Sequence, residues 1–378
     1  MTILQLGKFY PIRGGVEKVM WNLTRGLSER GVDCDMLCAR LPDGGTDDAD
    51  RPYEQEDGSF RFNGHGRVFC VKAWARKAAT MLSPAMVSWL RRHCAEYDII
   101  HVHHPDPMAA LALRLSGYRG KVVLHWHSDI LSQKVLLTLY KPLQRWLVRR
   151  AGVIVGTTPV YVQSSPYLRD VQDKCTYVPI GIKPIVYKDS GAASIRGRFP
   201  GRTLILSIGR LVPYKGYSVL VRAMKYLPEQ YHLLIGGSGP LRQELERIID
   251  EEKLRGRVTL EGYLPDETLP DYYGACDLFV LSSVMKTEAF GIVQIEAMSC
   301  GKPVVATMIP ESGVSWVNGD GVSGRNVPPG DPMALAAAVE DVQRHYGVFS
   351  EGAAARFEAL FTESKMIDSI LKIYEELV

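Results

Sequence analysis

The chain has 378 residues, which is too long for one ordinary hydrophobic core and predicts two domains of about 150–200 residues each. Hydrophobic residues make up 46% and charged residues 23% of the chain, a composition typical of globular proteins that excludes a disordered polypeptide. No run approaches the roughly 20 apolar residues that cross a bilayer, and the first residues lack the features of a secretion signal. We therefore expect a cytoplasmic protein, in which the seven scattered cysteines are small buried residues.

The net charge of +3 is unevenly distributed. Residues 1–190 contain 26 Lys and Arg against 18 Asp and Glu, whereas residues 191–378 contain 19 against 24. This asymmetry predicts that the N-terminal half faces an anionic partner, either a membrane surface or a phosphate-bearing acceptor. Nucleic acid is not expected, because no basic stripe with interleaved aromatic residues accompanies a known binding module.

Short apolar runs alternate with helical patterns along the first half of the chain. Strands are expected at Ile3–Leu6, Asp33–Leu37, Ile99–His103, Val122–His127, Val153–Gly156 and Thr176–Val178. Helices are expected at Val16–Arg30, Pro107–Leu115 and Leu131–Arg150. Near-continuous apolar strands separated by crossover helices are typical of a parallel sheet with helices on both faces.

The same alternation begins again in the second half. Strands are expected at Leu204–Ile208, His232–Ile235, Val258–Glu261, Leu278–Leu281 and Val304–Ala306. Helices are expected at Tyr217–Tyr226, Leu241–Glu252, Thr268–Ala275, Ile292–Ser299 and Pro332–His345. Two such series predict two doubly wound α/β domains. We place them at residues 1–185 and 186–360. A C-terminal helical segment, 361–378, can pack on either domain, and we expect it to pack back on the N-terminal one.

Glycines and histidines follow strands in the N-terminal half. Gly14 and Gly15 end a loop before a helix, where backbone amides can meet an anion, although a plain turn is the alternative. Five histidines gather at the ends of two strands, at positions 101, 103, 104, 125 and 127. We expect packing or hydrogen bonding rather than a metal site, because no carboxylate or cysteine interleaves at ligand spacing.

Two cations follow the first strand of the second half, at Arg210 and Lys215. Side chains on such a loop can both reach one diphosphate, Arg as a fork and Lys as a point charge. The next strand leads into Gly237-Ser238-Gly239, a glycine turn that lets backbone amides approach a phosphate. It is not a dinucleotide fingerprint, because Arg242 stands where the third glycine belongs.

Two glutamates surround the start of the helix that follows the fourth strand of the second half. Seven residues separate Glu288 from Glu296. The first amides of that helix, at Phe290-Gly291-Ile292, suit a donor phosphate, and a carboxylate beside a phosphate accepts hydrogen bonds from sugar hydroxyls. For an isolated pair of glutamates, a helix-dipole complement and a solvated helix residue are the simpler explanation.

The combination resembles retaining glycosyltransferase family four. The resemblance rests on the E-x7-E pair with Phe290-Gly291 between the glutamates, on Gly209-Arg210-Leu211 with Lys215-Gly216, and on the motifs at Gly237, at Glu261-Gly262-Tyr263-Leu264 and at Gly14-Gly15. It extends from residue 7 to about residue 330. It implies the GT-B fold, in which two Rossmann-like domains face each other across a cleft that holds the active site, and no required metal or other cofactor.

The resemblance also implies roles for individual residues. Arg210 and Lys215 would bind the diphosphate of the donor, and Glu296 its ribose. The resemblance assigns the remaining candidates as follows: Glu288 and the backbone of Phe290, Gly291 and Ile292 to the transferred sugar, Tyr263 and Leu264 to the base, Gly14, Gly15, Gly237 and Ser238 to substrate binding, and His127 to the active site. Ala289 departs from the larger or acidic residue of many members, which we expect to affect the choice of sugar.

The expected reaction is transfer of a hexose with retention of configuration. Asp106 and Asp129 each stand alone after a strand of the N-terminal half, so no paired carboxylates are expected at a strand end there for double displacement. We expect the leaving diphosphate to take the acceptor proton, while His127 positions the sugar and shares the developing charge. The donor is expected to be GDP- or UDP-linked, with GDP-mannose preferred on overall family resemblance.

The acceptor is expected to be a saccharide or a lipid-linked molecule of polysaccharide or glycolipid biosynthesis. Two segments, Arg67–His93 and Leu131–Arg150, contain Lys, Arg and interfacial aromatics but no acidic residue. Basic amphipathic helices are typical of peripheral contact with an anionic membrane, here the inner face of the plasma membrane; outer helices that merely cover a sheet are the alternative. A GT-B phosphorylase, an epimerase and a non-catalytic sugar-nucleotide-binding subunit remain the rival functions.

Overall fold

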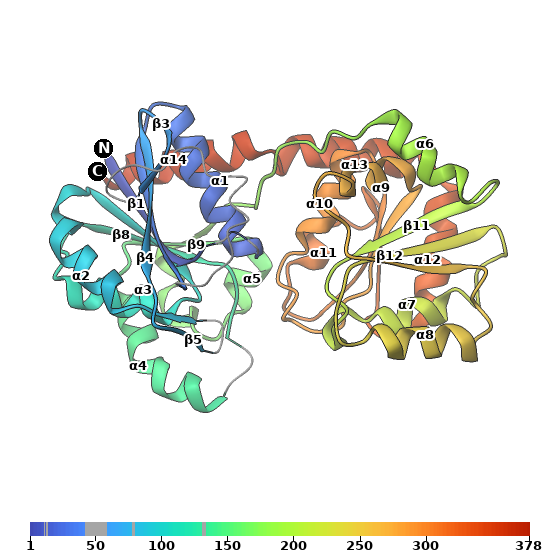
Figure 1. Cartoon of the computed structure of the whole chain (residues 1–378), viewed down its shortest axis with the longest axis horizontal. Coiled ribbons are helices and arrows are strands. Elements are labelled where there is room, and N and C mark those ends of the chain that lie inside the picture. Colours follow the sequence, from blue (N-terminus) through green and yellow to red (C-terminus); the bar gives the residue numbers. More distant parts are fainter. Residues whose placement is uncertain (11, 13, 42–58, 78–79, 131–133) are drawn as a thin grey trace. The chain divides into compact units, whose positions relative to one another are not determined.

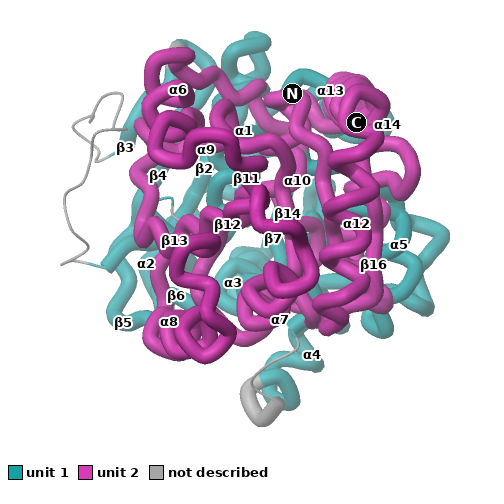
Figure 2. The backbone as a smooth tube through the Cα atoms, turned by 90° about the vertical axis from the view of Figure 1, so that its right-hand side faces the viewer, with its two compact units in different colours: residues 1–180, 363–378 teal, residues 181–362 magenta. Residues whose placement is uncertain are grey.

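The computed structural model describes residues 1–10, 12, 14–41, 59–77, 80–130 and 134–378. The chain divides into two compact units, coloured separately in Figure 2. Unit 1 comprises Met1–Ile180 and Glu363–Val378, and unit 2 comprises Gly181–Thr362. The division after residue 180 lies five residues before the expected one, and the final helix belongs with the N-terminal unit.

Unit 1 is built on one mainly parallel sheet. Within the described residues its eight strands have the order β10-β9-β8-β7-β1-β2-β4-β3, and only the β3–β4 edge pair is antiparallel. Its strands are β1 (Thr2–Phe9), β2 (Asp33–Arg40), β3 (Ser59–Asn63), β4 (Gly66–Lys72), β7 (Ile99–His104), β8 (Lys121–Trp126), β9 (Val153–Gly156) and β10 (Cys175–Tyr177). Its helices are α1 (Gly15–Glu29), α2 (Pro84–His93), α3 (Pro107–Ser116), α4 (Lys134–Arg150), α5 (Pro159–Ser164) and α14 (Glu363–Leu377), with a single turn at Cys94–Glu96 and a kinked 3₁₀ segment at Arg169–Lys174.

Helix α14 packs beside α1 although more than 330 residues separate them in the sequence (Figure 1). Arg25 of α1 bonds Glu363 at 2.7 Å, and Gly26 leaves room for Ile367, whose Cδ1 would lie 2.1 Å from an added Cβ. The inner side of α14 is apolar at Met366, Ile367 and Ile370, and all three are buried. Burial of this apolar stripe explains why the last helix belongs to unit 1.

Unit 2 contains a fully parallel sheet. Its six strands, counted over the described residues, have the order β13-β12-β11-β14-β15-β16. They are β11 (Thr203–Ile208), β12 (Tyr231–Gly236), β13 (Val258–Gly262), β14 (Leu278–Leu281), β15 (Val304–Thr307) and β16 (Gly324–Val327). The helices are α6 (Asp189–Gly197), α7 (Tyr217–Ala223), α8 (Arg242–Glu251), α9 (Leu269–Ala275), α10 (Ile292–Ser299), α11 (Val314–Val317), α12 (Pro332–Arg344) and α13 (Tyr346–Leu360), with a single turn at Pro213–Lys215.

The structure corrects the interpretation of the first basic segment. Residues 67–93 are not one amphipathic helix: they contain nearly all of β4, a hairpin of β5 (Ala75–Lys77) and β6 (Thr80–Leu82), and only then α2. The sequence analysis also missed β3 and β4, because alternating polar and apolar residues of an antiparallel edge pair differ from the apolar runs of a parallel core. The second basic segment does form α4, with residues 131–133 outside the described part.

None of the described helices combines the length and the apolar composition that crossing a bilayer takes.

Candidate functional site

Two glycine loops lie against each other at the carboxyl edge of the unit 2 sheet, after the neighbouring strands β11 and β12. The amide of Leu211 donates to the carbonyl of Ser238 at 2.9 Å. Gly237 has φ +139°, and a Cβ there would lie 1.9 Å from the carbonyl oxygen of Gly209. At Gly239 a Cβ would approach the oxygen of Leu211 to 2.5 Å. The glycines are therefore required for two backbones to pass closely, and this leaves Ser238 exposed at the edge.

Lys215 and Glu288 form an ion pair across the same edge. The Nζ of Lys215 lies 2.5 Å from Oε2 of Glu288, and the side chains are 11% and 12% exposed. Ser283 donates to the same carboxylate oxygen at 2.9 Å, while Ser282 donates to the Lys215 carbonyl. Both bonds to Glu288 are accepted by Oε2, so Oε1 has no hydrogen-bond partner within the described part of the chain. The structure thus brings together two of the predicted site residues and connects both to neighbouring serines.

Arg210, the second predicted cation, differs from Lys215. It is exposed at the tip of the loop after β11 and forms no ion pair with any residue that the structure describes. A guanidinium in this situation keeps all of its donors for a ligand.

The start of α10 is shaped by Gly291. This residue caps the helix with φ +75°, and a Cβ there would lie 2.6 Å from Leu281. The ring of Phe290 is buried against Phe361, so only the backbone at this position can face a ligand. Ile292 is the first helical residue, as expected.

Glu296 is held separately from Glu288. Its carboxylate accepts a hydrogen bond of 2.6 Å from the hydroxyl of Tyr273, a fully buried residue of α9. Burial, and then the neighbouring carboxylate, raises the pKa of this hydroxyl well above its usual value. Tyr273 therefore stays protonated and fixes the position of Glu296.

Tyr263 and Leu264 follow β13, next to the glycine loop. The amide of Gly237 donates to the carbonyl of Gly262 at 2.6 Å, and Leu264 covers Gly236. Tyr263 is 72% exposed, so its ring is available to a flat ligand.

In unit 1, Gly14 and Gly15 lie at the start of α1, while Pro11 and Arg13 of the same loop lie outside the described residues. A Cβ on Gly14 would be 1.9 Å from Oε2 of Glu17, so the glycine makes room for that carboxylate to fold back. An acidic group already complements the helix dipole here. Anion binding at this loop stays a prediction.

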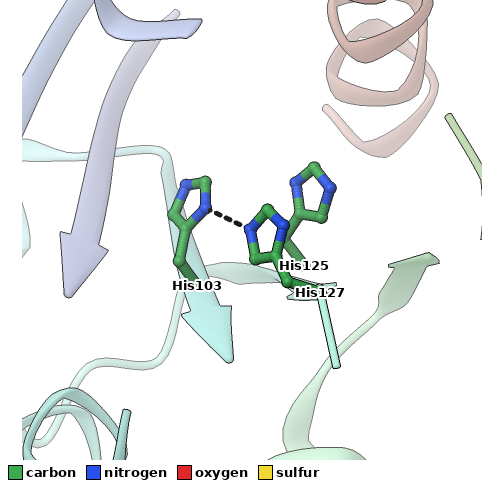
Figure 3. Close-up of side chains that lie close together, drawn as sticks. All are labelled: His103, His125 and His127. Carbon is green, nitrogen blue, oxygen red and sulfur yellow. Dashed lines mark hydrogen bonds between the residues drawn. The ribbon is translucent and has the colours of Figure 1, made fainter. Parts of the chain in front are cut away.

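His127 directly follows β8 and belongs to a buried cluster of histidines, three of which appear in Figure 3. Its Nε2 lies 2.9 Å from Nδ1 of His103, and its ring stacks on that of His125 at 4.0 Å between centroids. The Nδ1 of His127 and both nitrogens of His125 lack hydrogen-bond partners among the described residues. On the opposite side of β7 and β8, His104 stacks on Trp126 at 3.7 Å.

Burial keeps these imidazoles neutral. It lowers the pKa of His125 to about 3 and, together with the charge of Lys8, that of His104 to about 3. Burial, and then the neighbouring His125, places the pKa of His127 well below its usual value. His127 is therefore a neutral hydrogen-bonding group at physiological pH.

The ring geometry of the cluster does not suit a metal ion, although His103, His125 and His127 each place a ring nitrogen within 4.8 Å of the other two. A metal lies about 2.0–2.1 Å from each ligand nitrogen, in the plane of its ring. The rings of His125 and His127 are stacked with only 8° between their planes, so no point near both lies in both planes. The expectation of no metal stays a prediction, which this geometry favours.

Several residues of these sites escaped the sequence analysis. Gln5, a polar residue inside an apolar strand, was the available signal for the histidine cluster, because its amide accepts from His103 at 2.8 Å. Tyr374, which completes that network, gave no signal, because the sequence does not tell where α14 packs. Ser283 and Tyr273 orient the two glutamates and belong to no motif.

Comparisons with known proteins agree with this architecture. Residues 13–184 match the family described as Glycosyltransferase Family 4, and residues 193–346 match the one described as Glycosyl transferases group 1. The O-antigen chain mannosyltransferase C of Escherichia coli is 31% identical over 387 residues, which cover 100% of this chain and 99% of that protein. The D-rhamnosyltransferase WbpZ of Pseudomonas aeruginosa is 29% identical over 370 residues, 96% of this chain and 92% of that protein.

Among solved structures, Anabaena Alr3699/HepE in complex with UDP superimposes with a TM-score of 0.78 at 21% identity, over 100% of both chains. This likeness confirms the predicted GT-B fold class of two Rossmann-like parallel-sheet domains. On the strength of the full-length match at 31% identity and the two family matches, the chain belongs to the family-4 glycosyltransferases.

Proposed function

We propose that this glycosyltransferase transfers a hexose, with mannose preferred, from a nucleotide-diphosphate sugar to a saccharide or lipid-linked acceptor, with retention of configuration and without a metal. The proposal rests above all on the paired Lys215 and Glu288 at the carboxyl edge of the unit 2 sheet. The preference for mannose is supported by the name of the E. coli relative, an O-antigen chain mannosyltransferase, which also favours polysaccharide or glycolipid biosynthesis.

The donor diphosphate would bind beside the glycine loops. Lys215 is fixed by Glu288, whereas Arg210 has no ion-pair partner among the residues that the structure describes, so one cation is preorganised and the other adapts to the ligand. Oε1 of Glu288 would accept a hydrogen bond from a hydroxyl of the transferred sugar, and the backbone from Phe290 to Ile292 would complete that subsite. The two glutamates of the E-x7-E pair would thus have different roles. Glu288 would bind the sugar, whereas Glu296, which accepts a hydrogen bond from Tyr273, would bind the ribose.

Retention is supported by the state of the carboxylates in unit 1. Asp106 caps α3, accepts from Met108 and Ala109, and also takes the amide of Lys8. Oδ1 of Asp129 accepts from the Trp126 indole at 2.9 Å and from the Ser165 hydroxyl at 2.7 Å. Neither is therefore suited to act as a nucleophile. In same-face transfer, the bond from the anomeric carbon to the diphosphate breaks, the bond to the acceptor oxygen forms, and the acceptor proton passes to the leaving diphosphate.

A peripheral membrane contact would bring a lipid-linked acceptor to the enzyme. Trp74 and Leu139 are 77% and 75% exposed, and Lys141, Arg145 and Arg149 are exposed on α4. We expect co-sedimentation with anionic vesicles that high salt abolishes and that neutral vesicles do not support. Binding to neither kind of vesicle at low salt would contradict the membrane contact.

A donor screen tests the proposed function. Thermal shifts with UDP-, GDP-, ADP- and dTDP-sugars identify the nucleotide, and assays of donor hydrolysis and sugar transfer follow. Arg210→Ala and Lys215→Ala should each reduce turnover roughly 10²–10³-fold, with a much smaller loss of nucleotide affinity. Lys225→Ala is the matched control, because Lys225 pairs with Glu252 at 2.7 Å on the surface of the same unit. Turnover like that of the control would contradict the assignment, and NMR of the product anomer tests retention.

A further inference from the structure

A continuous hydrogen-bond chain connects the last helix of the protein to His127. The Nε2 of Gln5 donates to the hydroxyl of Tyr374 at 2.9 Å, and that hydroxyl lies 2.5 Å from Nδ1 of His101. The Oε1 of Gln5 lies 2.8 Å from Nε2 of His103, whose Nδ1 is 2.9 Å from His127. All five residues are buried within unit 1.

This series of hydrogen bonds determines which ring nitrogen of His103 and of His127 bears a proton. An amide oxygen can only accept, so Nε2 of His103 must be the protonated nitrogen. A neutral His103 then has a bare Nδ1, which accepts from Nε2 of His127. The remaining nitrogen of His127, Nδ1, is buried in the free protein and is left with a lone pair and no partner among the described residues.

The Tyr374 hydroxyl links the amide of Gln5 to His101, whose Nδ1 lies 2.5 Å from the hydroxyl oxygen. With Nδ1 of His101 bare, the hydroxyl donates its single proton to that nitrogen and accepts from the NH₂ of the Gln5 amide, so that the amide oxygen faces His103. If the amide turned over, its NH₂ would donate to His103, and the protons on His103 and His127 would both move to Nδ1.

We propose that Tyr374, Gln5 and His103 are positioning residues that hold His127 as the Nε2–H tautomer, so that its Nδ1 accepts a hydrogen bond from a sugar hydroxyl. The inference rests on the proposed function for the hydroxyl, but the tautomer itself is a property of the free protein. This tautomer also changes the role expected for His127. A neutral ring with a bare Nδ1 accepts a hydrogen bond from a hydroxyl, and it carries no positive charge to share with the reacting sugar. The C-terminal helix becomes part of the site through a single hydroxyl.

The tautomer is measured directly by ¹⁵N NMR of the full chain labelled at histidine, which distinguishes protonated from bare ring nitrogens. The wild-type protein should give one state for His127, protonated at Nε2. Tyr374→Phe removes the hydroxyl and should give a mixture of both tautomers at His103 and His127. Tyr97→Phe is the matched control, because it removes a buried hydroxyl that bonds Asp35 at 2.8 Å in the same unit.

An unchanged single tautomer in Tyr374→Phe, or a mixture in the wild type, would overturn the inference whether or not the protein transfers sugar. In an active enzyme, Tyr374→Phe should lower kcat roughly tenfold with unchanged affinity for the free nucleotide, as for loss of one aligned hydrogen bond. An equal fall in Tyr97→Phe would show a general loss of packing and would contradict the positioning role. Zn²⁺ that stabilises the wild type but not His125→Gln against heat would assign the cluster to a metal and would also overturn the inference.

Discussion

The buried histidines predict that unit 1 loses stability steeply on mild acidification. A buried histidine can stay neutral in the folded protein and yet titrate near pH 6.5 in the unfolded one. As the pH falls below 6.5, the unfolded state then binds more protons, and the free energy of unfolding decreases. Between pH 7.5 and 5.5 this amounts to about 1.4 kcal/mol for each such residue. His104 and His125, each with a pKa of about 3 in the folded protein, together account for about 2.7 kcal/mol, a substantial part of a typical stability of about 5–15 kcal/mol.

Urea unfolding at the two pH values, followed by tryptophan fluorescence, measures this effect, since five of the six tryptophans lie in unit 1. In His125→Gln the loss of stability between pH 7.5 and 5.5 should be about 1.4 kcal/mol smaller than in the wild type. His65→Gln, at a half-exposed site of the same unit, should not reduce this loss. Burial raises the pKa of Asp106, which acts in the opposite sense, but this contribution is common to all three proteins and cancels. Equal pH dependence in His125→Gln and the wild type would refute the reasoning.

Three further predictions concern individual contacts. Gly237→Ala should destabilise unit 2 by about 2–4 kcal/mol and abolish nucleotide binding, measured by urea unfolding and calorimetry, because its Cβ meets the carbonyl of Gly209. Tyr273→Phe should weaken nucleotide binding by about 1–2 kcal/mol in calorimetry, because Glu296 loses a charge-assisted hydrogen bond, while unchanged affinity would speak against a role in ribose binding. Leu139→Ser should reduce vesicle binding severalfold without changing donor hydrolysis, and equal vesicle binding would remove α4 from the membrane contact.

The sequence predicted the parallel sheets well because their strands are apolar on both faces. Strands such as β9 and β14 have the expected bounds, and the apolar run ends where the polar edge begins. The hairpin of β5 and β6 could not be predicted in the same way, because Met81 is its one buried residue among those described, so no regular apolar pattern marks either strand. The basic composition of residues 67–93 was real, but composition does not determine a helix.

The candidate site divides in a similar manner. Motif residues such as Lys215 and Glu288 could be named because they stand in short local patterns of the sequence, and the structure pairs them. Their supporting partners could not, because Ser283 and Tyr273 act through single contacts that leave no periodic trace. Tyr374 is the extreme case: its contact with Gln5 spans 369 positions, and it exists only because α14 belongs to unit 1.

The two units differ in the kind of chemistry that they can supply. Unit 2 offers charges at its sheet edge, an exposed Arg210 and a fixed Lys215, which suit a diphosphate. Unit 1 offers neutral imidazoles whose pKa values burial has moved below the physiological range, which suit uncharged hydroxyls. It follows that protonation of His127 should not produce the acidic limb of the pH–rate profile. Activity lost between pH 6.5 and 5.5 should instead follow the unfolding of unit 1, and should return on neutralisation at the rate at which that unit refolds.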